Sequence, residues 1–165
     1  MAVVIAPITL ADVESFRECL DAVAREARYL ALLEAPPLEH MRQFVVANIA
    51  NGVPQFVAKE GDAVVGWCDI TPGWHHALRH CGSLGMGLLP AYRGQGIGAH
   101  MLDDCIERAK VAGITRVELE VRSDNASARR LYGRFGFEVE GIKRRGMRIH
   151  GEYFETIAMA LLIGK

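Results

Sequence analysis

The sequence contains little of what marks a membrane protein or a nucleic-acid-binding protein. Its net charge is −1, only 7% of its 165 residues are aromatic, and no apolar run approaches the roughly 20 residues that span a bilayer. No long basic run interleaved with aromatic residues is present, which argues against nucleic acid as a partner. The first residues, Met-Ala-Val-Val-Ile, lack the basic region of a secretion signal and indicate a strand instead. We therefore expect a cytoplasmic protein that binds neither a membrane nor a nucleic acid.

Cysteine is also scarce, and its spacing excludes the common metal-binding and redox motifs. No Cys-x-x-Cys pair occurs, and each of the four cysteines lies in an apolar stretch: Cys19, Cys68, Cys81 and Cys105. We expect reduced thiols in the hydrophobic core, with disulfides or metal binding as the less favoured alternative. His80 and His100 have no partners at the spacing of metal ligands, so we expect no metal site.

What the chain does contain is enough apolar sequence for one folded domain, 1–165. Half of the residues are hydrophobic and 24% are charged, which is typical of a globular domain with a substantial core. The charge is uneven, because residues 1–78 carry 5 Lys or Arg and 10 Asp or Glu, a net −5, whereas residues 79–165 carry 14 and 10, a net +4. A basic second half suits a polyanionic ligand, although ordinary scatter of surface charge would give the same asymmetry.

Apolar periodicity predicts a regular series of elements in the order β-α-α-β-β-β-α-β-α-β-β. The expected helices are at about 10–26, 38–51, 97–113 and 126–135, and the expected strands are at 3–5, 55–58, 63–70, 81–89, 116–122, 137–140 and 153–162. The charged stretch 143–146 is expected to be solvated between the last two strands. This order predicts an α/β (α+β) fold in which helices flank a mixed sheet.

Residues 93–98 (Arg-Gly-Gln-Gly-Ile-Gly) form the most informative stretch, because they join an apolar strand to the clearest helix in the sequence. The first turn of a helix leaves N–H groups unpaired and carries a partial positive charge, so a glycine loop at that point can bind a phosphate or diphosphate. Arg93 adds a fixed cation. Neither a Walker A loop, which ends in Gly-Lys-Ser/Thr, nor the Gly-x-Gly-x-x-Gly dinucleotide loop fits these residues. A plain strand-to-helix connection without a ligand is the alternative.

Two sequence blocks resemble the GCN5-related N-acetyltransferases. Residues 93–98 are similar to the Arg/Gln-x-x-Gly-x-Gly/Ala loop with which that family holds the diphosphate of acetyl-CoA, and residues 119–137 are similar to its Leu-x-Val, Asn-x-x-Ala-x-x-Leu-Tyr and Gly-Phe block. The resemblance implies a mixed, mostly antiparallel sheet of six to seven strands flanked by about four helices, with acetyl-CoA as cosubstrate. It also implies the cofactor-binding residues, namely Leu88, Leu89, Arg93, Gly94, Gln95, Gly96, Ile97, Gly98, Asn125, Ala128, Arg129 and Tyr132.

The resemblance also implies how acetyl transfer is catalysed. In the family, the strand before the glycine loop splays from its neighbour, and its freed backbone groups pair with the pantetheine arm, which here would bring an N–H near Leu88 to the thioester. Tyr132 matches the family tyrosine, and a phenol with a pKa of about 10 can protonate a departing thiolate. A core tyrosine without a catalytic role is the alternative. Asn125 is expected to cap the following helix, to contact the cofactor, or both.

The strand at 81–89 lacks the glutamate that many members of the family carry there as a base. Glycines occupy three of its positions, which predicts that another chain or a ligand approaches the backbone closely, or that the strand bulges: Gly82, Gly85 and Gly87. Four residues could instead end a water chain that removes the proton, although each also suits a surface or packing role: Glu34, His75, His76 and Glu120.

The acceptor amine is predicted by analogy with the family. Segments 29–40 and 74–80 are expected to wall the acceptor side, with Glu34 pairing an ammonium group and Trp74 offering apolar surface. Residues 136–160 resemble a bacterial subgroup that includes amino-acid N-acetyltransferases and enzymes that acetylate protein N-termini. We predict direct transfer, in a ternary complex, to a small primary amine such as an amino acid. A protein N-terminus or lysine, and a non-catalytic acyl-CoA-binding module, are the alternatives. A homodimer through the last strands is a separate hypothesis.

Overall fold

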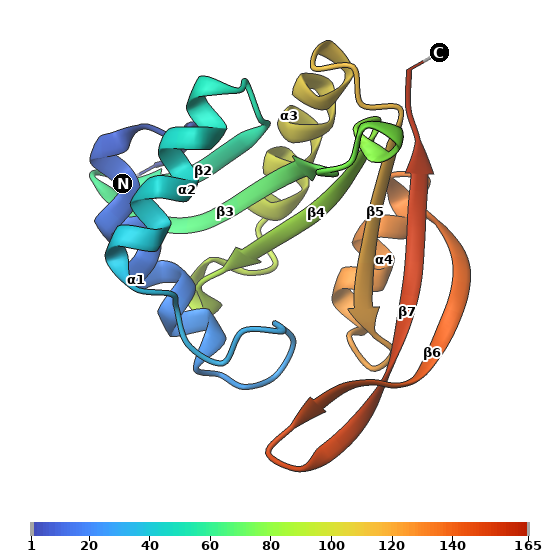
Figure 1. Ribbon diagram of the computed structural model, residues 1–165. Helices are drawn as coiled ribbons and strands as arrows, with labels where there is room; N and C mark the ends of the chain where they lie inside the picture. Colours follow the sequence, from blue (N-terminus) through green and yellow to red (C-terminus); the bar gives the residue numbers. More distant parts are fainter. Residues whose placement is uncertain (1, 165) are drawn as a thin grey trace.

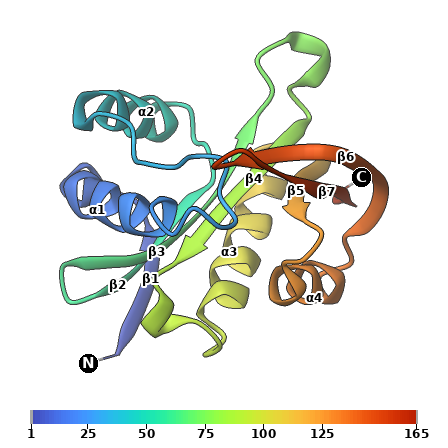
Figure 2. The ribbon, with the colours of Figure 1, turned by 90° about the horizontal axis from the view of Figure 1, so that it is seen from below.

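A seven-stranded sheet runs through the centre of the molecule and carries two helices on each face (Figures 1 and 2). The computed structural model describes residues 2–164. The strands are β1 (Val3–Pro7), β2 (Gln55–Glu60), β3 (Ala63–Pro72), β4 (Cys81–Leu88), β5 (Arg116–Arg122), β6 (Glu138–Ile149) and β7 (Glu152–Leu162), and the helices are α1 (Val13–Ala24), α2 (Leu38–Ala50), α3 (Ile97–Val111) and α4 (Ala126–Arg134). The order of helices and strands predicted from the sequence is confirmed.

The strands lie in the order β1-β2-β3-β4-β5-β7-β6, and every neighbouring pair is antiparallel except β4 and β5. This is the mixed, mostly antiparallel sheet that the family resemblance implied. Two neighbouring parallel strands need a crossover connection, and α3 provides it. The glycine loop and the N-terminus of α3 therefore follow directly from the carboxyl end of β4.

β4 and β5 diverge soon after they begin. They pair only over 81–83 and 116–118, whereas β4 pairs with β3 along its whole length to Leu88. Figure 1 shows the carboxyl ends of the two strands pointing apart. Beyond Ser83, one edge of β4 faces a gap in the sheet, as the family resemblance implied, and this gap opens on the side of the glycine loop.

Two apolar clusters hold the helices on the two faces of the sheet. The α1 side chains that meet the sheet recur every three or four residues, at the spacing of a helix: Val13, Phe16, Leu20 and Val23. On the other face, α3 buries an apolar stripe: Met101, Leu102, Cys105, Ile106 and Ala109. From Trp67 to Ile70 the residues of β3 alternate between the two clusters, with Trp67 on the α1 side and Cys68 and Ile70 on the α3 side. Position along this part of β3 therefore assigns each side chain to a face.

Capping interactions mark the helix ends, and the cysteines are reduced, as predicted. The Asp12 carboxylate accepts hydrogen bonds from the N–H of Thr9 at 2.8 Å and from its hydroxyl at 2.9 Å, just before α1. All four cysteines are free thiols, three of them buried and Cys81 half-buried. No helix within residues 2–164 is long and apolar enough to cross a membrane. Glycines with positive φ close three helices: Gly52, Gly113 and Gly136.

The last hairpin is longer than the sequence predicted. The expected strand at 137–140 was too short, because β6 continues to Ile149 and pairs with β7 along its length. Residues 143–146 are exposed, as predicted, but they lie within the strand. The pairing shifts register twice, and Arg145 has φ +54°, so bulges let a charged segment continue along the sheet edge. In Figure 1 this hairpin extends beyond the rest of the sheet.

Candidate active site

The glycine loop between β4 and α3 has the backbone geometry of an anion-binding turn. Gly94 has φ +73° and Gly96 has φ +82°, and Gly96 is the N-cap of α3. The first helical hydrogen bond runs from the His100 N–H to the Gly96 carbonyl at 3.1 Å, so three N–H groups ahead of it lack a helical acceptor. A Cβ at Gly94 or Gly96 would meet nothing within 4 Å. Glycine is therefore needed at these two positions because of their positive φ angles, and not because space is short.

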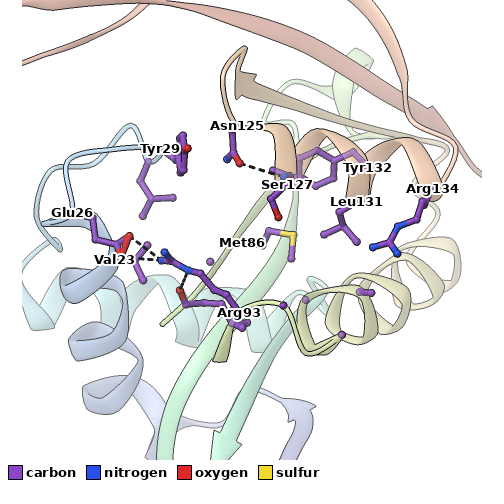
Figure 3. Close-up of a pocket in the computed structure, with 18 residues that line it drawn as sticks. Val23, Glu26, Tyr29, Met86, Arg93, Asn125, Ser127, Leu131, Tyr132 and Arg134 are labelled. Atoms are coloured by element: carbon purple, nitrogen blue, oxygen red, sulfur yellow. Dashed lines mark hydrogen bonds and ion pairs between the residues drawn. The ribbon is translucent and has the colours of Figure 1, made fainter. Parts of the chain in front are cut away.

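A cavity of about 320 Å³ lies in front of this loop, where β4 and β5 diverge (Figure 3). Its walls are the carboxyl end of β4, the loop, the N-terminal turn of α3, the length of α4, and the end of α1 with the segment that follows it. The volume falls in the range of small-molecule sites. The lining residues are Val23, Glu26, Tyr29, Leu30, Met86, Gly87, Leu88, Arg93, Gly94, Gly96, Gly98, Ala99, Asn125, Ser127, Ala128, Leu131, Tyr132 and Arg134.

The cavity brings together most of the residues that the sequence predicted for cofactor binding. Those lining it are Leu88, Arg93, Gly94, Gly96, Gly98, Asn125, Ala128 and Tyr132. Four others lie outside its lining. Gln95 donates to the Ala91 carbonyl at 3.0 Å and Arg129 to the Ser123 carbonyl at 3.0 Å, whereas Leu89 and Ile97 pack against the core. Their contact with a cofactor stays a prediction.

The two residues predicted to contact the acceptor also lie outside this cavity. Trp74 belongs to the segment that joins β3 to β4, at the end of the sheet where β4 and β5 still pair, and it is 94% exposed. Glu34 is exposed between α1 and α2, and its carboxylate lies 3.5 Å from the Arg25 guanidinium. Their contact with an acceptor stays a prediction. Among residues 2–164, no three His, Cys, Asp or Glu side chains are grouped so that they could hold a metal ion.

Arg93 is engaged in two interactions at the rim of the cavity. Its Nε donates to the Leu88 carbonyl at 2.9 Å, and its Nη2 lies 2.8 Å from one carboxylate oxygen of Glu26 and 3.1 Å from the other (Figure 3). The predicted cation is present, but it is paired with an acidic side chain that sequence reasoning missed. One signal was available: a negative charge just past the carboxyl end of a helix opposes the helix dipole, and such a local conflict often marks a functional position.

Asn125 and Tyr132 face the cavity from opposite ends of α4. The Asn125 Oδ1 accepts the Ala128 N–H at 3.2 Å, which confirms that Asn125 caps the helix. The Tyr132 ring lies 5.6 Å from the Phe137 ring, and burial raises the pKa of the phenol above its ordinary value. Tyr132 is therefore a neutral phenol at physiological pH. Within residues 2–164, no other group forms a hydrogen bond with its hydroxyl.

Arg122, at the end of β5, fixes the wall that carries Tyr29. Arg122 is only 6% exposed. Its guanidinium donates to the Arg28 carbonyl at 2.5 Å and pairs with the Asp124 carboxylate at 2.6 Å. It also stacks 3.5 Å above the centre of the Phe154 ring of β7. One buried cation thus ties the segment after α1 to both β5 and β7. Sequence reasoning missed this role, because the partners come from distant parts of the chain.

The glycines of β4 leave room for side chains of β3. A Cβ at Gly82 would lie 2.3 Å from Ile70 Cγ2, and a Cβ at Gly87 would lie 2.3 Å from the Trp67 ring. A Cβ at Gly85 would lie 3.4 Å from a carboxylate oxygen of Asp69. Side chains of β3 therefore account for glycine at positions 82 and 87, and close approach of a ligand to this strand stays a prediction.

The chain is similar to known acetyltransferases over most of its length. It matches the Acetyltransferase (GNAT) family over residues 17–137. It is 30% identical over 134 residues to the L-amino acid N-acetyltransferase AaaT of Escherichia coli, covering 80% of this chain and 82% of that protein. It is 35% identical over 99 residues to the N-alpha-acetyltransferase RimI of Mycobacterium tuberculosis, covering 57% and 58%.

Solved structures agree with this similarity. An acetyltransferase of the GNAT family from Streptococcus pneumoniae has a TM-score of 0.91 and 26% identity, covering 98% of this chain and 100% of that one. The structure of yncA from Salmonella typhimurium with its cofactor acetyl-CoA has a TM-score of 0.93 and 19% identity, covering 100% and 96%, and shares the fold. The family match, the relatives and the fold agree, and this protein is an N-acetyltransferase of the GNAT family.

Proposed function

We propose that this protein transfers the acetyl group of acetyl-CoA to a primary amine of a small molecule, with an amino acid as the favoured acceptor. One observation carries the proposal. A single cavity connects the glycine loop to Tyr132 across the gap between β4 and β5. A site with an anion-binding end and a proton-donating end suits an elongated cosubstrate that carries phosphates at one end and a thioester at the other.

The glycine loop would hold the diphosphate of acetyl-CoA. Its unpaired N–H groups and the positive end of the α3 dipole favour an anion, and the space above Gly94 and Gly96 is open. Arg93 adds a positive charge at the rim. The free edge of β4 between Ser83 and Leu88 offers backbone groups for the amides of the pantetheine arm, in the manner of an added strand.

Tyr132 would act at the thioester end of the cavity. In a ternary complex, the nitrogen of a neutral amine attacks the thioester carbon, and the C–S bond breaks with its electron pair on sulfur. A departing thiolate needs a proton, and the raised pKa of Tyr132 keeps the phenol protonated until that moment. The role of Tyr132 is therefore general acid, without a covalent acetyl-enzyme intermediate.

The choice of acceptor rests on the relatives. The relative at 30% identity that this chain matches over 82% of its length acetylates amino acids by its name, which favours a small amine. The N-alpha-acetyltransferase relative is matched over 58% of its length, and it supports a protein N-terminus as the second candidate. Both acceptors present a primary amine, so the same cavity chemistry serves either.

The test combines calorimetry with a transfer assay. Acetyl-CoA should bind to the purified protein, and thiol release should be measured across a panel of amino acids, their amides and short peptides with free N-termini. Transfer to free amino acids above peptides supports the first candidate, and the reverse order supports the second. Acetyl-CoA binding without transfer to any amine would instead indicate a non-catalytic acyl-CoA-binding module.

Tyr132→Phe separates binding from chemistry. We expect this variant to bind acetyl-CoA with an unchanged dissociation constant and to lose kcat by about 10²-fold or more, which is the usual size of a general-acid contribution. Turnover equal to that of the wild type would remove Tyr132 from the mechanism. Loss of acetyl-CoA binding in the same variant would assign it a structural role instead.

A further inference from the structure

Asp69 is an acidic residue in the middle of β3, near the centre of the sheet. It lies two residues after Trp67, so its side chain is on the α1 face, whereas its neighbours Cys68 and Ile70 face α3. The residue is half-buried and therefore keeps contact with solvent. Sequence reasoning gave it no role, because a lone aspartate in a strand resembles an ordinary surface residue of a half-exposed sheet.

The Asp69 carboxylate has few partners. Its one hydrogen bond comes from the Thr71 hydroxyl at 3.4 Å, which is long, and no ion pair within residues 2–164 includes it. The residues directly across from it are Gln55 on β2 and Gly85 on β4, and neither ionises. Burial raises the pKa of the Asp69 carboxyl to about 7.

Other ionisable groups on this face are engaged elsewhere or neutral. On α1, the Cys19 thiol faces the sheet, and burial raises its pKa to about 12. On β5, Glu118 pairs with Arg116 at 3.0 Å, and Glu120 pairs with Lys143. From α2, Asn48 donates to Gln55 at 3.0 Å and is neutral. Among residues 2–164, no cation on the surrounding elements is therefore paired with the Asp69 charge.

Gly85 places this carboxylate next to the gap in the sheet. Gly85 pairs directly with Asp69, and the two carboxylate oxygens lie 3.4 and 3.8 Å from the position that a Gly85 Cβ would occupy. β4 loses its β5 partner after Ser83, so Gly85 stands at the closed end of the gap, and the next residues, from Met86 to Leu88, line the cavity. A side chain at position 85 would stand beside the carboxylate on this face.

We propose that Asp69 is the general base of the acetyl transfer and takes the proton from the acceptor ammonium at the closed end of the gap. The inference rests on the proposed function and adds to it the group that the sequence could not supply. β4, the strand before the glycine loop, has no carboxylate. The neighbouring strand β3 provides one, because the Asp69 carboxylate lies against Gly85 of β4. Of the four candidate bases, Glu34 and Glu120 are held in ion pairs with Arg25 and Lys143. His75 and His76 are exposed between β3 and β4, at the end of the sheet where β4 and β5 still pair.

The proton balance of the step is complete. Asp69 accepts one proton from the ammonium, and the lone pair of the resulting amine forms the C–N bond to the acetyl carbon. The C–S bond breaks with its electrons on sulfur, and Tyr132 protonates that sulfur. The second proton that the nitrogen loses returns Tyr132 to its phenol form, and Asp69 releases its proton to water. A base that is half ionised near neutral pH is suited to this exchange.

The decisive variant is Asp69→Asn, which keeps the shape and removes the base. Once an acceptor has been found for the wild type, we expect kcat/KM to rise with pH through an apparent pKa near 7. In the variant, we expect kcat/KM at neutral pH to fall by about 10²- to 10⁴-fold. We also expect the rise of kcat/KM with pH, the acidic limb of the profile, to disappear. The dissociation constant of acetyl-CoA should stay within about twofold, since the carboxylate is assigned to the acceptor side. Asp62→Asn, in the exposed turn between β2 and β3, is the matched control and should leave rate and profile unchanged.

Stability separates catalysis from a structural role. The pKa of Asp69 in the folded protein lies above the ordinary value of 3.8. The free energy of unfolding therefore falls as the pH rises from about 4 to 7, and it stays at the lower value above pH 7. Asp69→Asn should therefore be at least as stable as the wild type at pH 8. If the variant still fails to fold, Asp69→Glu tests the same point, because it retains a carboxylate and should keep the acidic limb with part of the turnover.

Three results would overturn the assignment of Asp69. The first is unchanged turnover in Asp69→Asn, and the second is an acidic limb that persists in the variant. The third is a fall in acetyl-CoA affinity or in stability that matches the fall in turnover, because it would make Asp69 structural. A wild type that transfers acetyl to no amine would contradict the proposed function itself, and the assignment of a base would fall with it.

Discussion

The indole of Trp67 depends on the absence of a side chain at Gly87. Trp67 is 4% exposed and packs against Phe16 of α1, with ring centroids 5.9 Å apart. Because a Cβ at Gly87 would lie 2.3 Å from the ring, Gly87→Ala would force the indole into the α1 cluster. We expect the free energy of unfolding, measured with chemical denaturant, to fall by about 1–3 kcal/mol.

Gly133→Ala in α4 provides the control for that experiment. It adds the same methyl group to a helical position where nothing lies within 4 Å. Since alanine favours the helix, we expect a gain of about 0.5–1 kcal/mol. Equal stability of Gly87→Ala and the wild type would contradict the described packing of Trp67.

At the scale of elements, the glycine loop owes its shape to two left-handed residues. Alanine at Gly96 would have to adopt φ +82°, which costs roughly 1–2 kcal/mol. Alanine at Gly98 would occupy a helical position and meet Met86 at an ordinary 3.5 Å. We expect Gly96→Ala to weaken acetyl-CoA binding about tenfold by calorimetry and Gly98→Ala to weaken it much less. Equal losses would show that the loop conformation is not what binds the diphosphate.

The ion pair between Arg93 and Glu26 joins the glycine loop to the end of α1. Glu26 puts a negative charge on the wall of a cavity proposed to hold a polyanion, and it competes for the Arg93 guanidinium at 2.8 Å. Glu26→Gln should therefore tighten binding of coenzyme A by about two- to tenfold, with the larger effect at low ionic strength. Calorimetry at two salt concentrations measures this. An affinity unchanged at low salt would show that this pair does not oppose the ligand, and Arg93→Ala should weaken binding in the same buffers.

At the scale of the whole molecule, a ligand in the cavity would bridge two parts of the sheet. β1–β4 and β5–β7 meet through a pairing that covers only 81–83 and 116–118, and the cavity is lined by β4 on one side and by α4, which follows β5, on the other. Acetyl-CoA at about 100 times its dissociation constant should stabilise the fold by about 2.7 kcal/mol, which thermal unfolding detects as a higher midpoint. Acetyl phosphate carries the acetyl group without the nucleotide and pantetheine, so it should raise the midpoint far less. No shift with saturating acetyl-CoA would argue against binding in this cavity.

Most of the fold could be predicted because its signals are local. The α1 stripe from Val13 to Val23 and the α3 stripe from Met101 to Ala109 repeat at helical spacing, and both face the core as expected. The Thr9–Asp12 interaction and the positive-φ glycines lie beside the helix ends that they define. The end of β6 was misjudged, because exposed arginines and bulges obscure its periodicity and only pairing with β7 extends it to Ile149.

The sequence by itself determined the order of the elements, the left-handed turns of the glycine loop and the membership of the acetyltransferase family. Those features depend on residues that are close together in the chain. Only the tertiary structure decided that Glu26 meets Arg93, that Trp67 covers Gly87 and that Asp69 stands over Gly85. These contacts join different strands, helices and loops, so they exist only once the sheet has set its register and the helices have packed upon it.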